Sequence, residues 1–192
     1  GAFYIQGTVD PDPMAPPGTL AGGNVTVDSS TFFNNFAANN GGGIYVETTA
    51  VDVDIINSTL SANQSANRGA GLTNLGPDTS VRHSTITLNN SASTRGSGIT
   101  NIGSGITTVH STIVSDNVNF DIEAFGGPTT NIVSDNFNIV GSGNAVLSFS
   151  GSGDIVDNDP KLAPLLFNGG LTPTHRVLDD SPALDAGDPL AV

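Results

Sequence analysis

Two histidines lie beside hydroxyl residues in a repeated pattern that could support catalysis. His83 and His110 each begin the sequence His-Ser-Thr-Ile, and the two copies are 27 residues apart. A histidine can act as general base for a nucleophilic serine when a carboxylate orients it in a pocket. The same pattern also fits a repeat architecture, in which a residue is stacked on its copy from the preceding turn. The elements around the histidines decide between these interpretations.

Hydroxyl and glycine motifs recur through the chain at a nearly constant period, which favours stacked repeats. A Ser-Thr pair before an apolar residue occurs at intervals of 28, 26 and 27 residues, with its threonines at Thr31, Thr59, Thr85 and Thr112. A glycine motif keeps the same period, with its last glycines at Gly43, Gly71 and Gly98. Two motifs in one phase are the signature of a repeat protein.

The period predicts which residues share a column along the repeats. Apolar residues after each threonine are expected to point into a narrow core: Phe32, Leu60, Ile86 and Ile113. Corner residues four positions after each threonine are expected to hydrogen-bond to their copies: Asn35, Asn63, Asn89 and Asp116. The histidines fall in a polar column of their own: Ser29, Asn57, His83 and His110. We therefore interpret both histidines as members of a stack rather than as catalytic residues.

The composition and the repeats predict an all-β fold. Only 12% of the residues are charged and 24 are glycine, while β-branched residues and glycines interrupt every helical window. Short strands separated by Asn and Gly corners, repeated every 20–30 residues, indicate a parallel β-helix. We expect about six coils, which at ~4.8 Å per coil would make a rod about 30 Å long.

The sequence suggests a repeat body over residues 1–153 and a closing tail over residues 154–192. Gly1-Ala2-Phe3-Tyr4 resembles Gly42-Gly43-Ile44-Tyr45, but it lies 41 residues upstream. A Pro-rich loop insertion at about residues 9–21 accounts for the extra length, because proline lacks the donor that a strand needs. The tail is expected to fold back as a cap over the last open coil.

Charge and composition argue against several classes of partner. The net charge is -13, with five Lys and Arg in total, so nucleic acid and anionic membranes are disfavoured. The chain has no cysteine, no apolar run that would span a membrane and no recognisable leader. Export without disulfides is more typical of bacteria than of small animal ectodomains.

The C-terminal stretch carries a more specific resemblance. It contains Asp159-Pro160-Lys161-Leu162, then Asn-Gly-Gly-Leu-Thr-Pro-Thr-His over residues 168–175, then Ser-Pro-Ala-Leu-Asp-Ala-Gly over residues 181–187. These motifs resemble the signature that closes the right-handed β-helix of bacterial surface proteins described as choice-of-anchor Q or CSLREA-type. The resemblance implies right-handed coils and a place outside the cell, and it implies no catalytic residues. The family usually continues into an anchor, whereas this sequence stops at Val192.

Three groups of carboxylates could do chemistry in a β-helix. Asp52 and Asp54 alternate, so they face one side of a strand and could hold calcium or act on sugars. The other groups are Asp116, Asp121 and Glu123, and Asp154, Asp157 and Asp159. Polysaccharide lyases and hydrolases with β-helix folds use such clusters, but the bases here form no acid–base pattern with them: Arg68, Arg82, Arg95, Lys161 and Arg176.

Threonine, histidine and asparagine residues raise three smaller possibilities. Thr85 and Thr87 form one Thr-x-Thr pair of the kind that binds ice in some β-helices, and Thr59 with Ser61 approximates it. His175 belongs to the tail signature, where a hydrogen-bonded capping role is favoured over catalysis. Acceptor sequences for N-glycosylation occur at Asn24, Asn57, Asn63 and Asn89, and they matter only in a host that glycosylates.

We therefore predict an exported structural or adhesive β-helix module that is not an enzyme. It would be secreted or lie at a bacterial cell surface, and it would present a polar face to a glycan, a surface protein or a copy of itself. We assign it no catalytic residue, metal or cofactor, no nucleic acid and no direct membrane insertion. A carbohydrate-active β-helix enzyme and an ice-binding β-helix are the alternatives.

Overall fold

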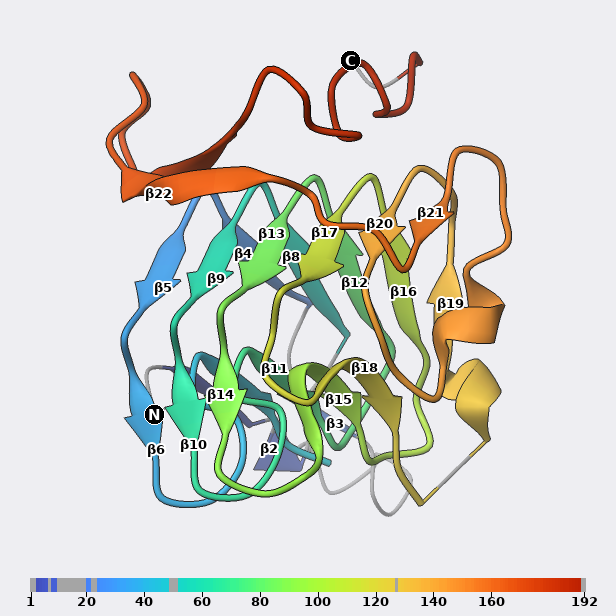
Figure 1. Cartoon of the computed structure of the whole chain (residues 1–192). Helices are drawn as coiled ribbons and strands as arrows, with labels where there is room; N and C mark the ends of the chain where they lie inside the picture. Colours follow the sequence, from blue (N-terminus) through green and yellow to red (C-terminus); the bar gives the residue numbers. More distant parts are fainter. Residues whose placement is uncertain are drawn as a thin grey trace.

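The protein is an all-β parallel solenoid of about four turns. The computed structural model describes residues 3–6, 8–9, 20–21, 24–48, 52–126 and 128–190. Three long parallel sheets and one short sheet run along the solenoid, and each full turn contributes one strand to each of the long sheets (Figure 1). Among the described residues, no helix has the length and apolarity that a membrane span needs.

Strands from successive turns pair in parallel to make the sheets. The first sheet contains β1 (Phe3–Ile5), β7 (Ile44–Val46), β11 (Leu72–Asn74), β15 (Gly96–Asn101) and β18 (Phe120–Ala124). The second sheet contains β4 (Val25–Asp28), β8 (Val53–Ile56), β12 (Thr79–Arg82), β16 (Thr107–His110) and β19 (Ile132–Ser134). The third sheet contains β5 (Thr31–Phe33), β9 (Thr59–Ser61), β13 (Thr85–Thr87), β17 (Ile113–Ser115), β20 (Ile139–Val140) and β21 (Ile155–Val156).

The remaining elements are short. A fourth sheet contains β6 (Phe36–Ala37), β10 (Gln64–Ser65) and β14 (Asn90–Ser91). Two antiparallel pairs lie outside the turns, namely β2 (Thr8–Val9) with β3 (Leu20–Ala21) and β22 (Leu162–Leu166) with β23 (Thr174–Val177). Two 3-10 helices follow the fourth turn, η1 (Thr129–Asn131) and η2 (Val146–Ser148).

The expectation of about six coils is wrong, because the two ends of the repeat region do not form complete turns. The first turn is preceded only by β1, and the last pairings of the third sheet come from β20 and β21. About four turns at the ~4.8 Å strand spacing give a rod about 19 Å long. The body also extends slightly past residue 153, since β21 still pairs with β20.

Columns of apolar side chains fill the inside of the solenoid. Leu60, Ile86 and Val114 lie in one column of the third sheet and are fully buried. Parallel pairing in register places each of them directly over its neighbour, so the core is continuous along the axis. Phe32 packs against the first-turn end of this core.

The fourth turn is shifted by one residue from the register that the sequence suggested. Thr85 pairs with Ile113 and not with Thr112, so Val114 takes the core position predicted for Ile113. The cause is a corner loop, because residues 102–106 contain one residue more than residues 75–78 at the same place in the preceding turn. The glycine motif precedes that loop and keeps its predicted register.

The same shift corrects the predicted histidine column. Ser29, Asn57, His83 and Ser111 share the left-handed backbone conformation between the second and third sheets, with φ of 48°, 50°, 49° and 44°. His110 instead pairs with Arg82, one position earlier. The predicted alignment of His110 with His83 is therefore wrong, although their rings meet edge to face at 5.5 Å.

The expected insertion at about residues 9–21 begins and ends in an antiparallel strand pair, β2 with β3. Residues 10–19, which hold its prolines, lie outside the described residues. At the other side of the insertion, the start of the chain follows the predicted alignment, because Phe3, Tyr4 and Ile5 pair with Ile44, Tyr45 and Val46.

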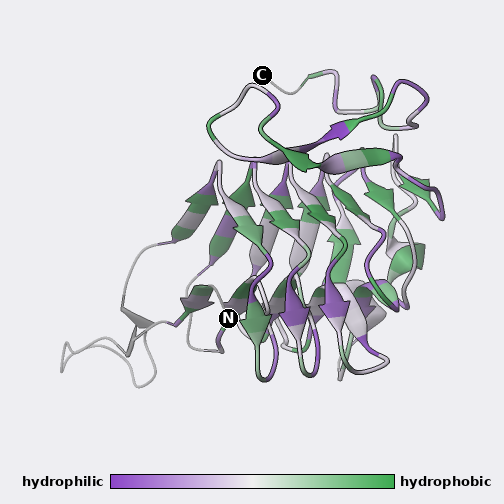
Figure 2. Ribbon diagram, turned by 60° about the vertical axis from the view of Figure 1, so that its left-hand side comes forward, coloured by the Kyte–Doolittle hydropathy of each residue, from purple (hydrophilic) through white to green (hydrophobic). Residues whose placement is uncertain are grey.

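From β22 onward, the described part of the C-terminal tail lies along the side of the solenoid and not over the end of its last turn. Pro173 accepts a hydrogen bond from Thr31 on the first turn, His175 bonds to Ser61 on the second, and Asp188 bonds to Ser111 on the fourth. Figures 1 and 2 show the β22–β23 hairpin crossing the stacked strands. The predicted position of the cap is therefore wrong, because these contacts hold the tail against several turns at once.

Candidate functional site

Asparagines at one corner of the solenoid form a continuous hydrogen-bonded ladder. The Oδ1 atom of Asn63 accepts two hydrogen bonds from Asn35. One comes from the backbone N–H, with an N–O distance of 3.1 Å, and the other from Nδ2, at 2.9 Å. Asn89 does the same for Asn63, and Asn117 does the same for Asn89. The register shift puts Asn117 in this ladder in place of the predicted Asp116.

A second ladder runs along the neighbouring corner, where each side-chain oxygen accepts the backbone N–H of the preceding turn. The accepting residues are Ser58, Ser84, Thr112, Asn138 and Asp154. The two ladders therefore use the Ser, Thr and Asn residues that recur with the period of the sequence. Their role is to satisfy buried backbone donors at the corners.

Aspartates end both ladders. Asp121 accepts the backbone N–H and Nδ2 of Asn117 with one oxygen, and the N–H and hydroxyl of Ser142 with the other. Asp154 accepts four hydrogen bonds in the same way, two of them from Asn138. The last residue of a ladder must accept hydrogen bonds from the turn before it, but no turn follows to which it could donate. An ionised carboxylate suits this position because it only accepts.

The Glu123 side chain is buried and takes part in contacts that stabilise the fold. Its side chain is 3% exposed, one oxygen accepts the N–H of Gly96, and the other lies 3.6 Å from Arg95. The guanidinium groups of Arg95 and Arg68 both lie over the ring of Phe125. Asp116, Asp121 and Glu123 therefore do not converge on one site, because the carboxylates of Asp121 and Glu123 are engaged in hydrogen bonds that stabilise the fold.

An acidic depression remains near the end of the third sheet. It has a volume of about 260 Å³, and Asp116, Asp121, Asp157 and Asp159 line it. Burial raises the pKa of the Asp116 carboxyl, and the charges of Asp159 and Asp121 add to this effect. Asp159 itself accepts the backbone N–H of Lys161.

The Asp52 and Asp54 pair lines a separate shallow depression of about 190 Å³ on the second sheet. Both side chains face the same side, as the alternation predicts. Asp54 is paired with Arg82 at 3.3 Å, and Asp78 in the same depression accepts the N–H of Ile106. Within the described ranges, no group of three or more His, Asp or Glu side chains is arranged to hold a metal ion.

His110 lies between a serine and two carboxylates, but the distances do not make a catalytic arrangement. Its Nε2 is 3.4 Å from Ser111 Oγ and 3.5 Å from the Asp188 carboxylate, while its Nδ1 contacts the backbone oxygen of Asp135 and lies 3.9 Å from the Asp135 carboxylate. A serine nucleophile needs its base within about 2.6–3.2 Å and a carboxylate hydrogen-bonded to the opposite ring nitrogen, and both distances at His110 are longer than a hydrogen bond of this kind. His110 instead joins the tail to the fourth turn through Asp188.

The tail also explains the other predicted surface features. His175 contacts Ser61 through Nε2 and the backbone oxygen of Ala163 through Nδ1, so its hydrogen-bonded role agrees with the prediction. Thr59 is only 5% exposed, because the threonine column of the third sheet lies under the tail. Two predicted glycosylation acceptors, Asn63 and Asn89, are fully buried in the ladder.

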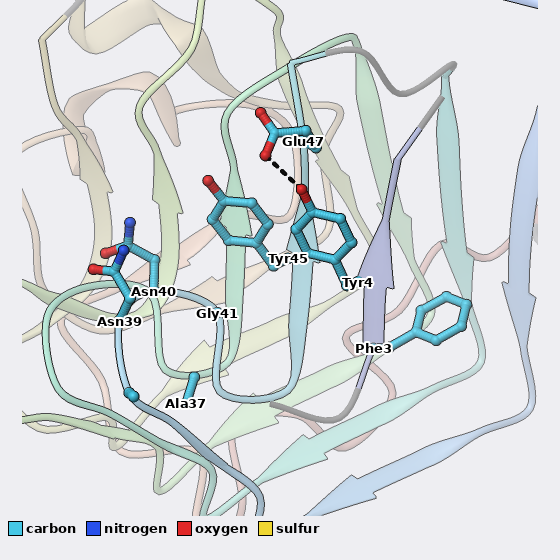
Figure 3. A pocket seen from close by; sticks show the side chains of 9 residues that line it. Phe3, Tyr4, Ala37, Asn39, Asn40, Gly41, Tyr45 and Glu47 are labelled. Carbon is cyan, nitrogen blue, oxygen red and sulfur yellow. Dashed lines mark hydrogen bonds between the residues drawn. The ribbon is translucent and has the colours of Figure 1, made fainter. Parts of the chain in front are cut away.

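An aromatic pocket, which no repeated motif marks, opens on the outer face of the first sheet. It has a volume of about 450 Å³ and is lined by Phe3, Tyr4, Tyr45, Glu47 and the corner residues 37–41. Figure 3 shows Tyr4 and Tyr45 side by side, with Asn39 and Asn40 at one edge. In the sequence, the pocket is indicated only by the two tyrosines of the chain, which fall at equivalent positions of successive turns.

Ring stacking and hydrogen bonds define the arrangement of the side chains in the pocket. The two tyrosine rings are stacked, with centroids 5.4 Å apart and planes 5° from parallel. Tyr4 donates its hydroxyl to Glu47 at 2.7 Å, and the other oxygen of Glu47 accepts the N–H and hydroxyl of Thr48. The hydrogen bond from Tyr4 lowers the pKa of the Glu47 carboxyl, and the two bonds from Thr48 lower it further.

We compared the chain with protein-family models, curated proteins and solved structures, and none of them matches. The resemblance to choice-of-anchor Q and CSLREA-type surface proteins therefore stays a prediction, and so do the roles that it implies.

Proposed function

We propose that this chain is a secreted or cell-surface structural and adhesive module of bacterial origin. It is a right-handed parallel β-helix that binds a glycan, a surface protein or a copy of itself without catalysis. The observation that carries this proposal is the use of the polar residues. Both ladders employ them to hold the turns together, whereas the aromatic pocket leaves tyrosine rings and amide groups accessible.

The described contacts of the tail support a rigid binding module. The tail bonds to the first, second and fourth turns, so the turns cannot slide past one another without breaking these contacts. Rigid elements hold a binding surface in place and reduce the entropy that ordering would cost on association.

An array of immobilised glycans and surface proteins, probed with the labelled chain, tests the proposal. Sedimentation of the chain alone over a range of concentrations tests self-association. The proposal predicts saturable binding in at least one of these assays, with the bound glycan unchanged by mass spectrometry. It is overturned if none shows binding, or if the bound glycan is cleaved.

A carbohydrate-active enzyme is the second candidate, and the acidic depression is the observation that favours it. Glycosidases pair one protonated carboxyl with one ionised carboxylate. Asp116 has a raised pKa and lies with Asp157 and Asp159 in the depression. Asp121 is committed to four hydrogen bonds, which weighs against a catalytic role for it. Turnover of a polysaccharide that the Asp116→Asn variant abolishes would favour this candidate over a binding module.

A further inference from the structure

The two tyrosines form one aromatic surface that is open to solvent. Register pairing of β1 with β7 places Tyr4 next to Tyr45, and the parallel planes make the two rings a stepped platform. Tyr4 remains 56% exposed although the pocket has walls on its other sides. An exposed aromatic platform in a concave site is suited to a ligand that presents a flat face of C–H groups.

Polar groups with unused hydrogen-bonding capacity surround this platform. The amide oxygens of Asn39 and Asn40 accept hydrogen bonds from Asn67 and from the backbone N–H of Arg68, at 3.4 and 3.2 Å. Within the part of the chain that the structure describes, the Nδ2 atoms of Asn39 and Asn40 and the hydroxyl of Tyr45 make no hydrogen bond. A ligand with several hydroxyl groups can use two amide donors and one hydroxyl.

Charge narrows the class of ligand. Glu47 is ionised at neutral pH, since its pKa lies below the ordinary value of 4.5. The chain as a whole carries a net charge of -13. A uronic acid, a sialic acid or a sulfated sugar would meet like charge both in the pocket and at long range.

We propose that the Tyr4–Tyr45 pocket is a binding subsite for an uncharged pyranose of a glycan. One sugar face stacks on the tyrosine rings, and its hydroxyl groups bond to the amides of Asn39 and Asn40. Glu47 holds Tyr4 in place and excludes acidic sugars. This inference rests on the proposed adhesive function, because it names the ligand class of such a module.

Intrinsic fluorescence tests the subsite directly. The chain has two tyrosines and no tryptophan, so its tyrosine emission reports on this pocket alone. The probes are neutral oligosaccharides built from glucose, mannose, galactose and N-acetylglucosamine, with oligogalacturonate as the acidic counterpart of the galactose series. We expect a saturable change in emission with at least one neutral series, and at least about tenfold weaker binding of oligogalacturonate. No saturable change with any neutral series would overturn the proposal, and so would preference for oligogalacturonate.

Variants measured by calorimetry assign the binding to named residues. Tyr45→Ala is expected to weaken binding at least about tenfold, whereas Tyr45→Phe keeps the stacking ring and stays within about threefold of the parent. Asn39→Ala, at an exposed corner, is expected to weaken binding without affecting the fold. Leu171→Ala is the matched control, because that side chain is fully exposed on the tail. Unchanged affinity in both Tyr45→Ala and Asn39→Ala contradicts the proposal, provided that circular dichroism shows both to be folded.

Glu47→Gln tests the charge argument. The variant keeps an oxygen that can accept the Tyr4 hydroxyl, and it removes the negative charge. We expect neutral oligosaccharides to bind as before and the discrimination against oligogalacturonate to shrink; unchanged discrimination would contradict the role of Glu47. Array binding that survives Tyr45→Ala would reject this subsite and leave the adhesive function standing, whereas a chain that binds nothing at all would reject both.

Discussion

Asp121 accepts two hydrogen bonds from Asn117 with a single carboxylate oxygen, each 2.9 Å long. Asn63, Asn89 and Asn117 each accept this pair of bonds from the preceding turn, so Asp121 takes the place of a fifth asparagine. The chain reaches it four residues after Asn117 instead of one period later. The aspartate is thus part of the corner ladder, although its residue type first suggests catalysis.

Replacing Asp121 by alanine is expected to destabilise the protein by about 2–4 kcal/mol, because four hydrogen-bond donors lose their acceptor. Equilibrium urea denaturation followed by circular dichroism measures the change. Asp157→Asn is the control, since Asp157 is exposed in the same depression and its side chain makes no hydrogen bond to the residues that the structure describes. Equal stability of the parent and Asp121→Ala would show that the hydrogen bonds at the end of the ladder do not contribute to the free energy of unfolding.

Asp116→Asn is expected to raise stability slightly at neutral pH. A carboxyl whose folded pKa is raised favours folding most below its unfolded pKa, and this contribution is lost as the pH rises through the folded pKa. At pH 7 the ionised group therefore opposes folding. Because Asp116 is largely solvent-exposed, we expect a gain of only about 0.5 kcal/mol.

Thermal unfolding of the parent and Asp116→Asn at pH 7 and pH 3 checks this expectation. The difference should be present at pH 7 and vanish at pH 3, where Asp116 is protonated. Asparagine tolerates the left-handed backbone of this position, where φ is 60°, so the substitution adds no backbone strain. A variant less stable than the parent at pH 7 would mean that the charge of Asp116 has a favourable partner.

Tyr4 and Glu47 should shift each other's titration in opposite directions. The hydrogen bond to Glu47 raises the pKa of the Tyr4 hydroxyl, with smaller contributions from burial and from the charge of Glu47. For Tyr45, burial comes first and the charge of Glu47 second, and both raise its pKa. Tyrosinate absorbance should therefore appear above pH 10.0, the ordinary value for both groups.

In Glu47→Ala, which removes both the acceptor of the Tyr4 hydroxyl and the negative charge, the midpoint of this alkaline titration should move down toward the ordinary value. The stability that Tyr4 contributes is complete below pH 10.0 and is lost as the pH rises through its higher folded pKa. The contribution of Glu47 is present above pH 4.5 and is lost as the pH falls through its lower folded pKa. Circular dichroism at each pH separates the titration from unfolding, and an unshifted midpoint would argue against the hydrogen bond.

His175 should hold the tail on the second turn. The carbonyl oxygen of Ala163 can only accept, so Nδ1 of His175 carries the proton and Nε2 faces the hydroxyl of Ser61. In His175→Ala, amide hydrogens of residues 162–177 should exchange at least about fivefold faster, because each lost bond contributes about 1 kcal/mol. Arg176→Ala is the neighbouring control, since its ion pair with Asp179 is long and exposed. Equal exchange in both variants would show that His175 does not fix the tail.

The parallel solenoid and much of its register could be predicted from the sequence, because stacked turns repeat their residue types. The inward Leu60 and Ile86 and the asparagine corner of Asn63 and Asn89 follow directly from the period. The fourth turn could not be placed, because the second His-Ser-Thr-Ile copy suggests a 27-residue step. The added loop residue makes the step from Thr85 to Ile113 one residue longer.

The acidic ladder ends and the tail were harder to predict for a different reason. Asp121 and Asp154 lie four and 16 residues after the asparagines that they accept from, so no period marks them. The tail reaches Thr31 from Pro173, a contact between residues 142 apart that no local pattern encodes. The pairing of Tyr4 with Tyr45 could be predicted from the sequence, because the two residues occupy matching positions of successive turns. The position of the corner amides beside the two rings could not be predicted in this way.

The central claim is that this module binds without turnover, through its aromatic pocket and not through its acidic depression. One measurement tests it most directly: binding and product release for the parent, Tyr45→Ala and Asp116→Asn, with the best glycan from the fluorescence titration. We predict that Tyr45→Ala binds at least about tenfold more weakly, that Asp116→Asn binds like the parent, and that no variant releases product. Product release by the parent that disappears in Asp116→Asn would contradict the claim and identify an enzyme.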